Sequence, residues 1–183
     1  MLDLMVPVPA VQPASALPPA RDPAGPYRVC LVCLGNICRS PMAEVVLRAQ
    51  LTAAGLADQV TVDSAGTGGW HVGEPMNSGA RAALARRGYD GQAHRARQFA
   101  ALWLPGRDLF LAMDASNLKT LEPLFRTDPP SSSRLRLFGE VTALHGADVP
   151  DPYGGDAAEF DRVLAMLETA MPTLVARLSA VAA

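Results

Sequence analysis

The sequence predicts an α/β fold in which a four-stranded parallel sheet carries helices on both faces. Apolar segments with the length of buried strands alternate with longer segments that have the apolar spacing of helices. Strands that are separated by helices pair in parallel, because each helix returns the chain to the same end of the sheet. A parallel sheet is buried on both faces, so helices must cover both of them.

The first half of the chain contains two strands, each followed by a helix. Tyr27–Val32 is predicted as a buried strand, and a helix follows over Pro41–Ala54. Proline suits the start of a helix, where its missing N–H costs no hydrogen bond. Val60–Ser64 is the second predicted strand and Asn77–Arg87 the second helix. A glycine directly follows each of these helices and ends it.

The second half repeats this alternation. A strand over Asp108–Ala112 leads into a helix over Ala115–Phe125, and Asp114 directly before that helix has the chemistry of a cap and no more. A strand over Arg134–Phe138 follows, and the final helix is predicted over Ala157–Ala180. Its apolar residues have the spacing of one buried stripe. The stripe consists of Phe160, Val163, Leu164, Leu167, Met171, Leu174, Val175 and Leu178.

Composition divides the chain into an extension and one domain. Residues 1–26 are rich in proline and alanine, so we expect a disordered N-terminal extension, and residues 27–183 form the domain. The extension lacks the positive start and the uninterrupted apolar stretch of a secretory signal. A docking arm and an extension without function are equally compatible with it.

Charge and cysteine content exclude several classes of protein. A formal net charge of −2 gives no general basic surface for nucleic acid, and no apolar run approaches the length of a membrane span. Three cysteines do not make a disulfide framework. Cys30 and Cys33 have the spacing of a thioredoxin pair, but Cys30 lies inside the predicted strand and points away from the loop that begins at Cys33.

One short motif predicts the chemistry. Cys33 and Arg39 are separated by five residues, and Ser40 follows, between the first predicted strand and the first predicted helix. Loop amides and a helix N-terminus converge there on an anion such as phosphate. Arg39 can hold two oxygens of that anion with its planar guanidinium. A thiol at Cys33 is placed to ionise and to attack the phosphorus.

Other residues of the loop have the properties that a tight anion cradle needs. Gly35 lets the backbone approach the ligand closely, and both Gly35 and Asn36 tolerate left-handed dihedral angles. Ser40 is expected to cap the following helix and to donate a hydrogen bond to the Cys33 sulfur.

The segment from Val32 to Glu44, which contains this motif, closely resembles the active-site signature of the low-molecular-weight protein tyrosine phosphatases, of the bacterial and especially the actinobacterial type. Four further blocks resemble that family in the same order. They are Asp63–Thr67, His94–Gln98, Ala112–Leu118 and Asp151–Gly155. The resemblance covers Tyr27 to Leu178. It implies a flavodoxin-like three-layer fold of the phosphatase I type.

The resemblance also implies a reaction, the hydrolysis of protein phosphotyrosine through a phosphocysteine. Cys33 is the nucleophile, Arg39 the phosphate clamp and Asp151 the general acid and base. Chemistry alone requires a proton donor for the leaving oxygen. Asp151 lies on a long loop before the final helix, where a catalytic group can reach a neighbouring pocket. The sequence around Asp151 is also typical of an ordinary turn, and Asp148 is a nearby alternative for the general acid.

Two further groups of residues are assigned by the resemblance. The first supports the loop through hydrogen bonds and consists of Asn36, Ser40, Ser64 and His94. The second lines the pocket, with Leu34 and Ile37 at its base and Trp70, His71 and Tyr153 on its walls. Outside this resemblance, His94 has the properties of a structural residue, and Trp70 and Tyr153 could fill a core.

Cys38 lies on the same loop as Cys33, and we expect it to capture an oxidised Cys33 as a reversible disulfide. An inert buried thiol is the alternative. No metal and no organic cofactor are expected, because Arg39 and the loop amides supply the positive charge. The expected partner is a phosphotyrosine protein, without nucleic acid or membrane. The expected state is a cytoplasmic monomer, and secretion by a route that needs no signal stays open.

Four other functions were compatible with the scaffold. An arsenate reductase needs further cysteines, and none follows Cys38. A protein arginine phosphatase resembles this signature but has a smaller threonine in place of Ile37. A phosphatase of small molecules, or a bacterial tyrosine phosphatase linked to polysaccharide, differs only in substrate. A phosphate-binding module without activity would not need Cys33, Arg39 and Asp151 together.

Overall fold

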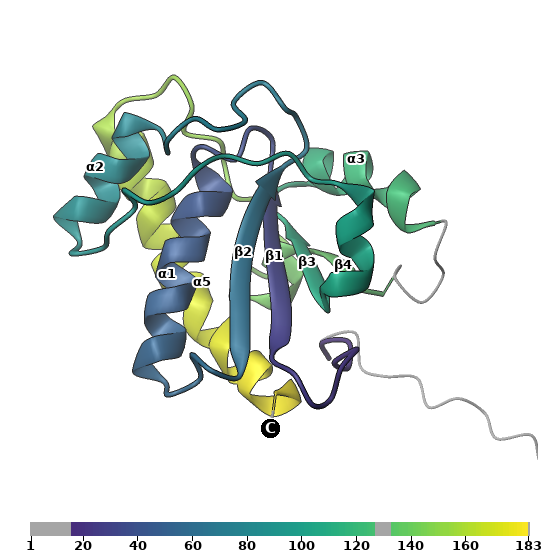
Figure 1. The fold of residues 1–183 in the computed structure, drawn as a ribbon. Coiled ribbons are helices and arrows are strands. Elements are labelled where there is room, and N and C mark those ends of the chain that lie inside the picture. Colours follow the sequence, from purple (N-terminus) through teal and green to yellow (C-terminus); the bar gives the residue numbers. More distant parts are fainter. Residues whose placement is uncertain (1–15, 127–132, 183) are drawn as a thin grey trace, which may run out of the picture.

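The computed structural model describes residues 16–126 and 133–182. Four strands in this part of the chain form one parallel sheet in the order β2-β1-β3-β4 (Figure 1). They are β1 Tyr27–Cys33, β2 Val60–Gly66, β3 Leu109–Ala112 and β4 Leu135–Leu137. The chain leaves β1 for β2 on one side and returns to β3 on the other. The gap between β1 and β3 is therefore the switch point, outside which such sheets bind ligands.

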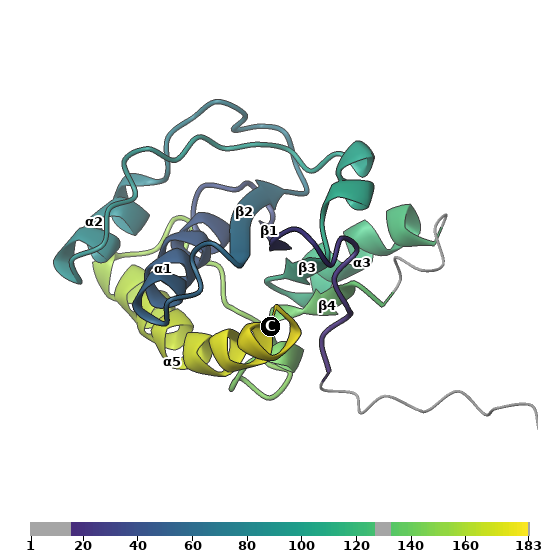
Figure 2. The same ribbon diagram turned by 60° about the horizontal axis from the view of Figure 1, so that its bottom comes forward.

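Helices cover both faces of the sheet, which confirms the predicted α/β fold (Figure 2). α1 Arg39–Ala53, α2 Ser78–Arg86 and α5 Ala157–Val181 contribute to one core, and α3 Ala115–Phe125 to the other. Both the first and the last residue of each predicted strand and helix lie within two residues of those observed. Two 3₁₀ helices, η1 Ala101–Gly106 and η2 Phe138–Val141, were not predicted.

The side chains of the central strand β1 alternate between the two cores. Val29 and Leu31 are buried against the α1 and α5 side, whereas Cys30 and Val32 are buried against the α3 side. Cys33 belongs to the first of these cores. Cys30 and Cys33 therefore lie on opposite faces of the sheet, so they do not form a thioredoxin-type pair.

The expected disordered extension is wrong for residues 16–26, whereas residues 1–15 lie outside the described part of the chain. Leu17 is 5% exposed and belongs to the core. The Tyr27 hydroxyl donates a hydrogen bond to the Pro18 carbonyl at 2.8 Å, and the Arg21 N–H donates to the Asp108 carboxylate at 2.6 Å. Proline content therefore prevented helix and strand, but not packing through a buried leucine and backbone hydrogen bonds.

Helix α5 combines a buried stripe with unusual length. The predicted stripe is buried, with Val175 only partly so, and Ala170 extends it. No apolar run of membrane-spanning length was expected, but by length and composition alone α5 is long and apolar enough to cross a membrane. Its apolar side chains pack against α1, α2 and the sheet, as in the core helix of a globular domain.

The contacts of residues 16–26 predict a measurable contribution to stability. Replacing Leu17 by alanine removes buried apolar surface and should lower the free energy of unfolding by about 2 kcal/mol. Leu102→Ala is the matched control, because Leu102 is 79% exposed, and should change it by less than about 0.5 kcal/mol. Urea unfolding followed by circular dichroism measures both. Equal stability of the two variants would contradict the packing of this segment.

Candidate active site

The predicted site residues converge at the carboxyl ends of the strands. Cys33 is the last residue of β1, and the loop that follows it leads directly into α1 at Arg39. The backbone of this loop is tied to the end of β2, because the N–H groups of Thr67 and Gly68 donate to the carbonyls of Cys33 and Leu34 at 2.8 and 2.9 Å. Strand, loop and helix thus form one continuous support around Cys33.

Asn36 is the centre of the hydrogen bonds that hold the loop. It is fully buried and has a left-handed φ of 56°. Its side-chain amide donates to the hydroxyls of Ser40 and Ser64 at 2.9 and 2.8 Å, and its side-chain oxygen accepts the Arg97 N–H at 2.8 Å. Its carbonyl lies 2.7 Å from His94 Nε2. The structure therefore brings Ser64 and His94 to the loop, as expected, and adds Arg97.

His94 has a defined protonation state in this arrangement. A carbonyl oxygen only accepts, so the imidazole carries a proton on Nε2 and donates it to Asn36. Burial lowers the pKa of His94 below its ordinary value, against the smaller opposing effects of the Asn36 hydrogen bond and of Glu44. His94 is therefore a neutral hydrogen-bond donor at pH 7 and a support for the loop.

Ser40 contacts the Cys33 sulfur but does not cap the helix. α1 begins two residues earlier than predicted, at Arg39, so Ser40 is already helical. Its hydroxyl accepts from Asn36 and lies 3.1 Å from Cys33 Sγ and 3.2 Å from the Ala65 carbonyl. Its single hydrogen can turn to the sulfur and stabilise a thiolate there.

Two glycines allow the loop to lie close to its neighbours. Gly35 tolerates a left-handed dihedral angle but does not adopt one. Within the loop only Asn36 has a left-handed φ. A β-carbon on Gly35 would instead lie 3.0 Å from the His71 ring. Gly66 at the end of β2 is more restricted, since its β-carbon would lie 2.7 Å from the Leu34 carbonyl oxygen and 3.1 Å from the Asn36 nitrogen. Sequence reasoning missed Gly66, although it lies in one of the family-like blocks.

Arg39 is buried and holds two carboxylates. Its Nη2 lies 2.6 Å from Asp151 Oδ2, and its Nη1 contacts Asp114 and the Val149 carbonyl, the latter at 3.2 Å. Its Nε has no hydrogen-bond partner among the described residues. Burial alone would lower the pKa of Arg39, but the hydrogen bond to Asp114 and the neighbouring Cys33 and Asp151 raise it overall. The guanidinium therefore stays charged.

Asp114 does more than cap α3, so the interpretation as a cap alone was wrong. One carboxylate oxygen accepts the Asn117 N–H at 2.6 Å, as a cap does. The other contacts Arg39. The start of α3 therefore fixes the position of the guanidinium beside the loop.

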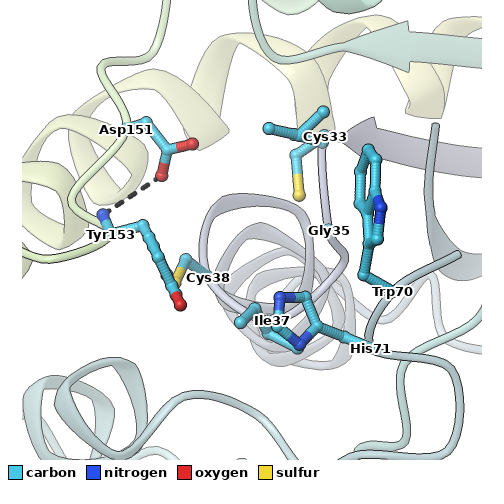
Figure 3. Close-up of a pocket in the computed structure, with 9 residues that line it drawn as sticks. Cys33, Gly35, Ile37, Cys38, Trp70, His71, Asp151 and Tyr153 are labelled. Atoms are coloured by element: carbon cyan, nitrogen blue, oxygen red, sulfur yellow. Dashed lines mark hydrogen bonds between the residues drawn. The ribbon is translucent and has the colours of Figure 1, made fainter. Parts of the chain in front are cut away.

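A pocket opens above Cys33, and its walls are the predicted ones (Figure 3). It is lined by Cys33, Leu34, Gly35, Ile37, Cys38, Trp70, His71, Asp151 and Tyr153. Trp70 and Tyr153 face the opening from opposite sides and are 73% and 62% exposed, so neither fills a core. His71 and Tyr153 pack with ring centroids 6.2 Å apart. The pocket is thus a slot with aromatic sides, and the loop that begins at Cys33 forms its floor.

The pocket brings the Cys33 sulfur and the Asp151 carboxylate together and leaves Cys38 buried beside them. The Cys33 sulfur and the Asp151 carboxylate both face the opening (Figure 3), and Asp151 Oδ1 accepts the Tyr153 N–H at 3.2 Å. All three cysteines are free thiols. Burial, followed by the nearby Asp151 and Cys33, raises the pKa of Cys38 to about 12. Cys38 is therefore a neutral thiol at physiological pH.

Comparisons with known proteins agree with this geometry. The model of the low molecular weight phosphotyrosine protein phosphatase family matches residues 28–182. A low molecular weight protein-tyrosine-phosphatase of Streptomyces coelicolor is 47% identical over 152 residues, which cover 82% of this chain and 92% of that protein. Low molecular weight protein-tyrosine phosphatase A of Mycobacterium bovis is 42% identical over 149 residues, covering 81% and 90%.

A solved structure extends the similarity to three dimensions. A protein tyrosine phosphatase from Entamoeba histolytica has a TM-score of 0.78 to this chain at 32% sequence identity. The match covers 84% of this chain and 97% of that one.

The close approach of Gly66 to the loop predicts that a single methyl group there impairs the site. Gly66→Ala should push the backbone of residues 34–36 away from Cys33 and lower kcat/KM by about a hundredfold. The affinity for vanadate should fall with it, because both depend on the same amides. Gly106→Ala is the control, since a β-carbon there meets no atom within 4 Å. Unchanged vanadate affinity in Gly66→Ala would contradict this role.

Proposed function

The chain belongs to the low molecular weight phosphotyrosine protein phosphatase family and is a cysteine-dependent phosphatase, and we propose how its residues carry out the reaction on a phosphotyrosine protein. The observation that carries the proposal is one pocket that holds the Cys33 sulfur and the Asp151 carboxylate between aromatic walls, with the buried Arg39 guanidinium donating a hydrogen bond to that carboxylate. Cys33 is the nucleophile, Arg39 the phosphate clamp and Asp151 the general acid and base.

In the first step the Cys33 thiolate attacks phosphorus, and a sulfur–phosphorus bond replaces the bond to the tyrosine oxygen. The amides of residues 34–39 and the N-terminus of α1 bind the phosphate oxygens. The Arg39 Nε–H, which has no partner among the described residues, is a free donor for one of them. Here the phosphate replaces Asp151 as the anionic partner of Arg39, and Asp151 in its protonated form gives its proton to the leaving phenolate.

In the second step water attacks the phosphocysteine. Asp151, now a carboxylate, takes a proton from that water, and Cys33 leaves as a thiolate with inorganic phosphate as the product. The Ser40 hydroxyl, 3.1 Å from the sulfur, stabilises the departing thiolate. The same carboxylate therefore serves both steps, and the enzyme returns to its starting state.

The shape of the pocket favours phosphotyrosine over other phosphorylated side chains. Trp70 and Tyr153 line the pocket that also holds Cys33, so a phenyl ring between these aromatic side chains would direct its phosphate toward the sulfur. Ile37 is 7% exposed and presents apolar surface to the pocket. This surface suits a ring and disfavours a guanidinium, which argues against arginine phosphatase activity.

The cellular setting follows from the chemistry of the thiol. A nucleophilic cysteine needs a reducing compartment such as the cytoplasm. The partner is a protein that carries phosphotyrosine, and this chain itself supplies the nucleophile, the clamp and the acid of the proposed site. A monomer is therefore the proposed working state.

We also retain the proposed redox role of Cys38. Peroxide converts the Cys33 thiolate to a sulfenic acid, and Cys38 attacks that sulfur, releasing water and forming a disulfide. The raised pKa of Cys38 makes this capture slow at neutral pH, because only the thiolate attacks.

A panel of phosphopeptides tests the proposed function directly. In excess chelator, wild type should release phosphate from a phosphotyrosine peptide at least about a hundredfold faster than from phosphoserine or phosphoarginine peptides, because only the ring fits the slot. Cys33→Ser should abolish release. A phosphate-binding module without activity would release none in either form. Preference for phosphoarginine would overturn the argument from Ile37.

The redox proposal predicts a pH dependence. With its pKa at about 12, the thiolate fraction of Cys38, and with it the rate of disulfide capture, should rise about tenfold per pH unit between pH 7 and 9. Mass spectrometry of peroxide-treated protein, with dimedone to label remaining sulfenic acid, measures that rate. Cys38→Ala should accumulate labelled Cys33 at every pH. Equal labelling of wild type and Cys38→Ala would eliminate this role.

A further inference from the structure

We propose that Asp148 is a positioning residue for the general acid, because it ties the loop that carries Asp151 to the start of α3. The inference rests on the proposed role of Asp151. Asp148 Oδ1 accepts the backbone N–H of Ala115 at 3.0 Å, across 33 residues of sequence. Ala115 is the first residue of α3, and its N–H is one of the donors that a helix leaves unsatisfied at its positive end.

The backbone next to Asp148 is fixed to the same region. The Val149 N–H donates to the Met113 carbonyl at 2.8 Å, and Val149 is fully buried. The Val149 carbonyl accepts a hydrogen bond from Arg39 at 3.2 Å. Residues 148 and 149 therefore cross the end of β3 and the start of α3 in one defined direction.

Two prolines restrict the backbone between this anchored segment and Asp151. Pro150 and Pro152 flank Asp151, and each restricts the backbone of the residue before it. The chain from Asp148 to Asp151 is thus stiff, so a change of angle at its beginning moves the carboxylate at its end. On the other side of Asp148 the backbone packs closely against Gly139, since a β-carbon on Gly139 would lie 2.2 Å from the Ala147 carbonyl oxygen.

The start of α3 therefore orients both charged partners of the reaction. Asp114 at its cap contacts Arg39, and the N–H of Ala115 holds Asp148. Asp148 is exposed, engaged with a backbone donor and absent from the pocket lining. Asp148 therefore anchors the loop that carries Asp151. It is not itself the general acid, the role for which it was the alternative candidate.

The experiment compares substrates that depend differently on the acid. A phosphotyrosine peptide has a poor leaving group and needs the proton, whereas p-nitrophenyl phosphate has a good leaving group and needs it less. The ratio of the two kcat/KM values in one sample does not depend on the fraction of protein that is folded. The variants are Asp148→Ala, Asp148→Asn, Asp151→Asn and the double variant Asp148→Ala/Asp151→Asn. The control is Asp22→Ala, which removes another exposed aspartate that accepts a backbone N–H.

Asp148→Ala should lower kcat/KM for the phosphotyrosine peptide about tenfold and for p-nitrophenyl phosphate less than about threefold. Asp148→Asn keeps an oxygen acceptor for Ala115 and should restore the wild-type ratio. Added to Asp151→Asn, Asp148→Ala should change nothing further, because the group that it positions is gone.

Three results would overturn the inference. The first is equal loss on both substrates in Asp148→Ala, the second a ratio like that of Asp22→Ala, and the third an additive effect in the double variant. Each of these three results can be observed only if the wild type is active, so each would overturn this inference and leave the proposed function intact. A wild type that cleaves neither substrate would overturn the proposed function and this inference with it.

Discussion

The left-handed turn at Asn36 and its hydrogen bonds are the constraint on which the site depends. Asn36 is an L-residue with a φ of 56°, a conformation that is tolerated only with local support. The support comes from α1 through Ser40, from β2 through Ser64 and from the segment around His94 and Arg97. Each polar atom of a fully buried amide is satisfied, so the loop is held in shape before any anion arrives. Preorganised amides stabilise developing charge without reorganisation during the reaction.

Arg39 joins this loop to the rest of the catalytic machinery. A guanidinium that is 2% exposed is stable only beside opposite charge, and Asp114 and Asp151 supply it. Because Asp114 caps α3 and Asp151 lies on the loop before α5, one cation connects three parts of the chain that are far apart in sequence. The two ion pairs of Arg39 therefore fix the loop, the start of α3 and the segment around Asp151 relative to one another.

The sequence predicted the elements well because their signals are local. Apolar runs, helical stripes and terminal glycines need no knowledge of distant contacts, and the largest errors occurred at the start of α1 and the end of β2. β2 is longer because Ala65 and Gly66 still pair with Val32 and Cys33 of β1, and α1 begins early because the Cys33 loop leads directly into it at Arg39. The predicted chemistry of Cys33, Arg39 and Asp151 depended on residue type and on the resemblance to a family. The structure adds how their side chains are arranged.

What the sequence could not predict involves backbone geometry between distant segments. Gly66 matters because of a carbonyl oxygen of the loop, and Arg97 contributes its N–H and not its charge to Asn36. Asp114 resembled an ordinary cap because its contact with Arg39 spans 75 residues. Residues 16–26 had the composition of a tail, and only their packing places Leu17 in the core.

The aromatic walls have a consequence for how such an enzyme diversifies. The side chains of Trp70 and Tyr153 stand at the rim and contribute none of the hydrogen bonds that brace Asn36. Mutations at these two positions can therefore retune which phosphoproteins are admitted without disturbing bond cleavage. Selection can act on recognition and on reactivity almost independently, so paralogues could acquire new targets through few substitutions and without an inactive evolutionary intermediate.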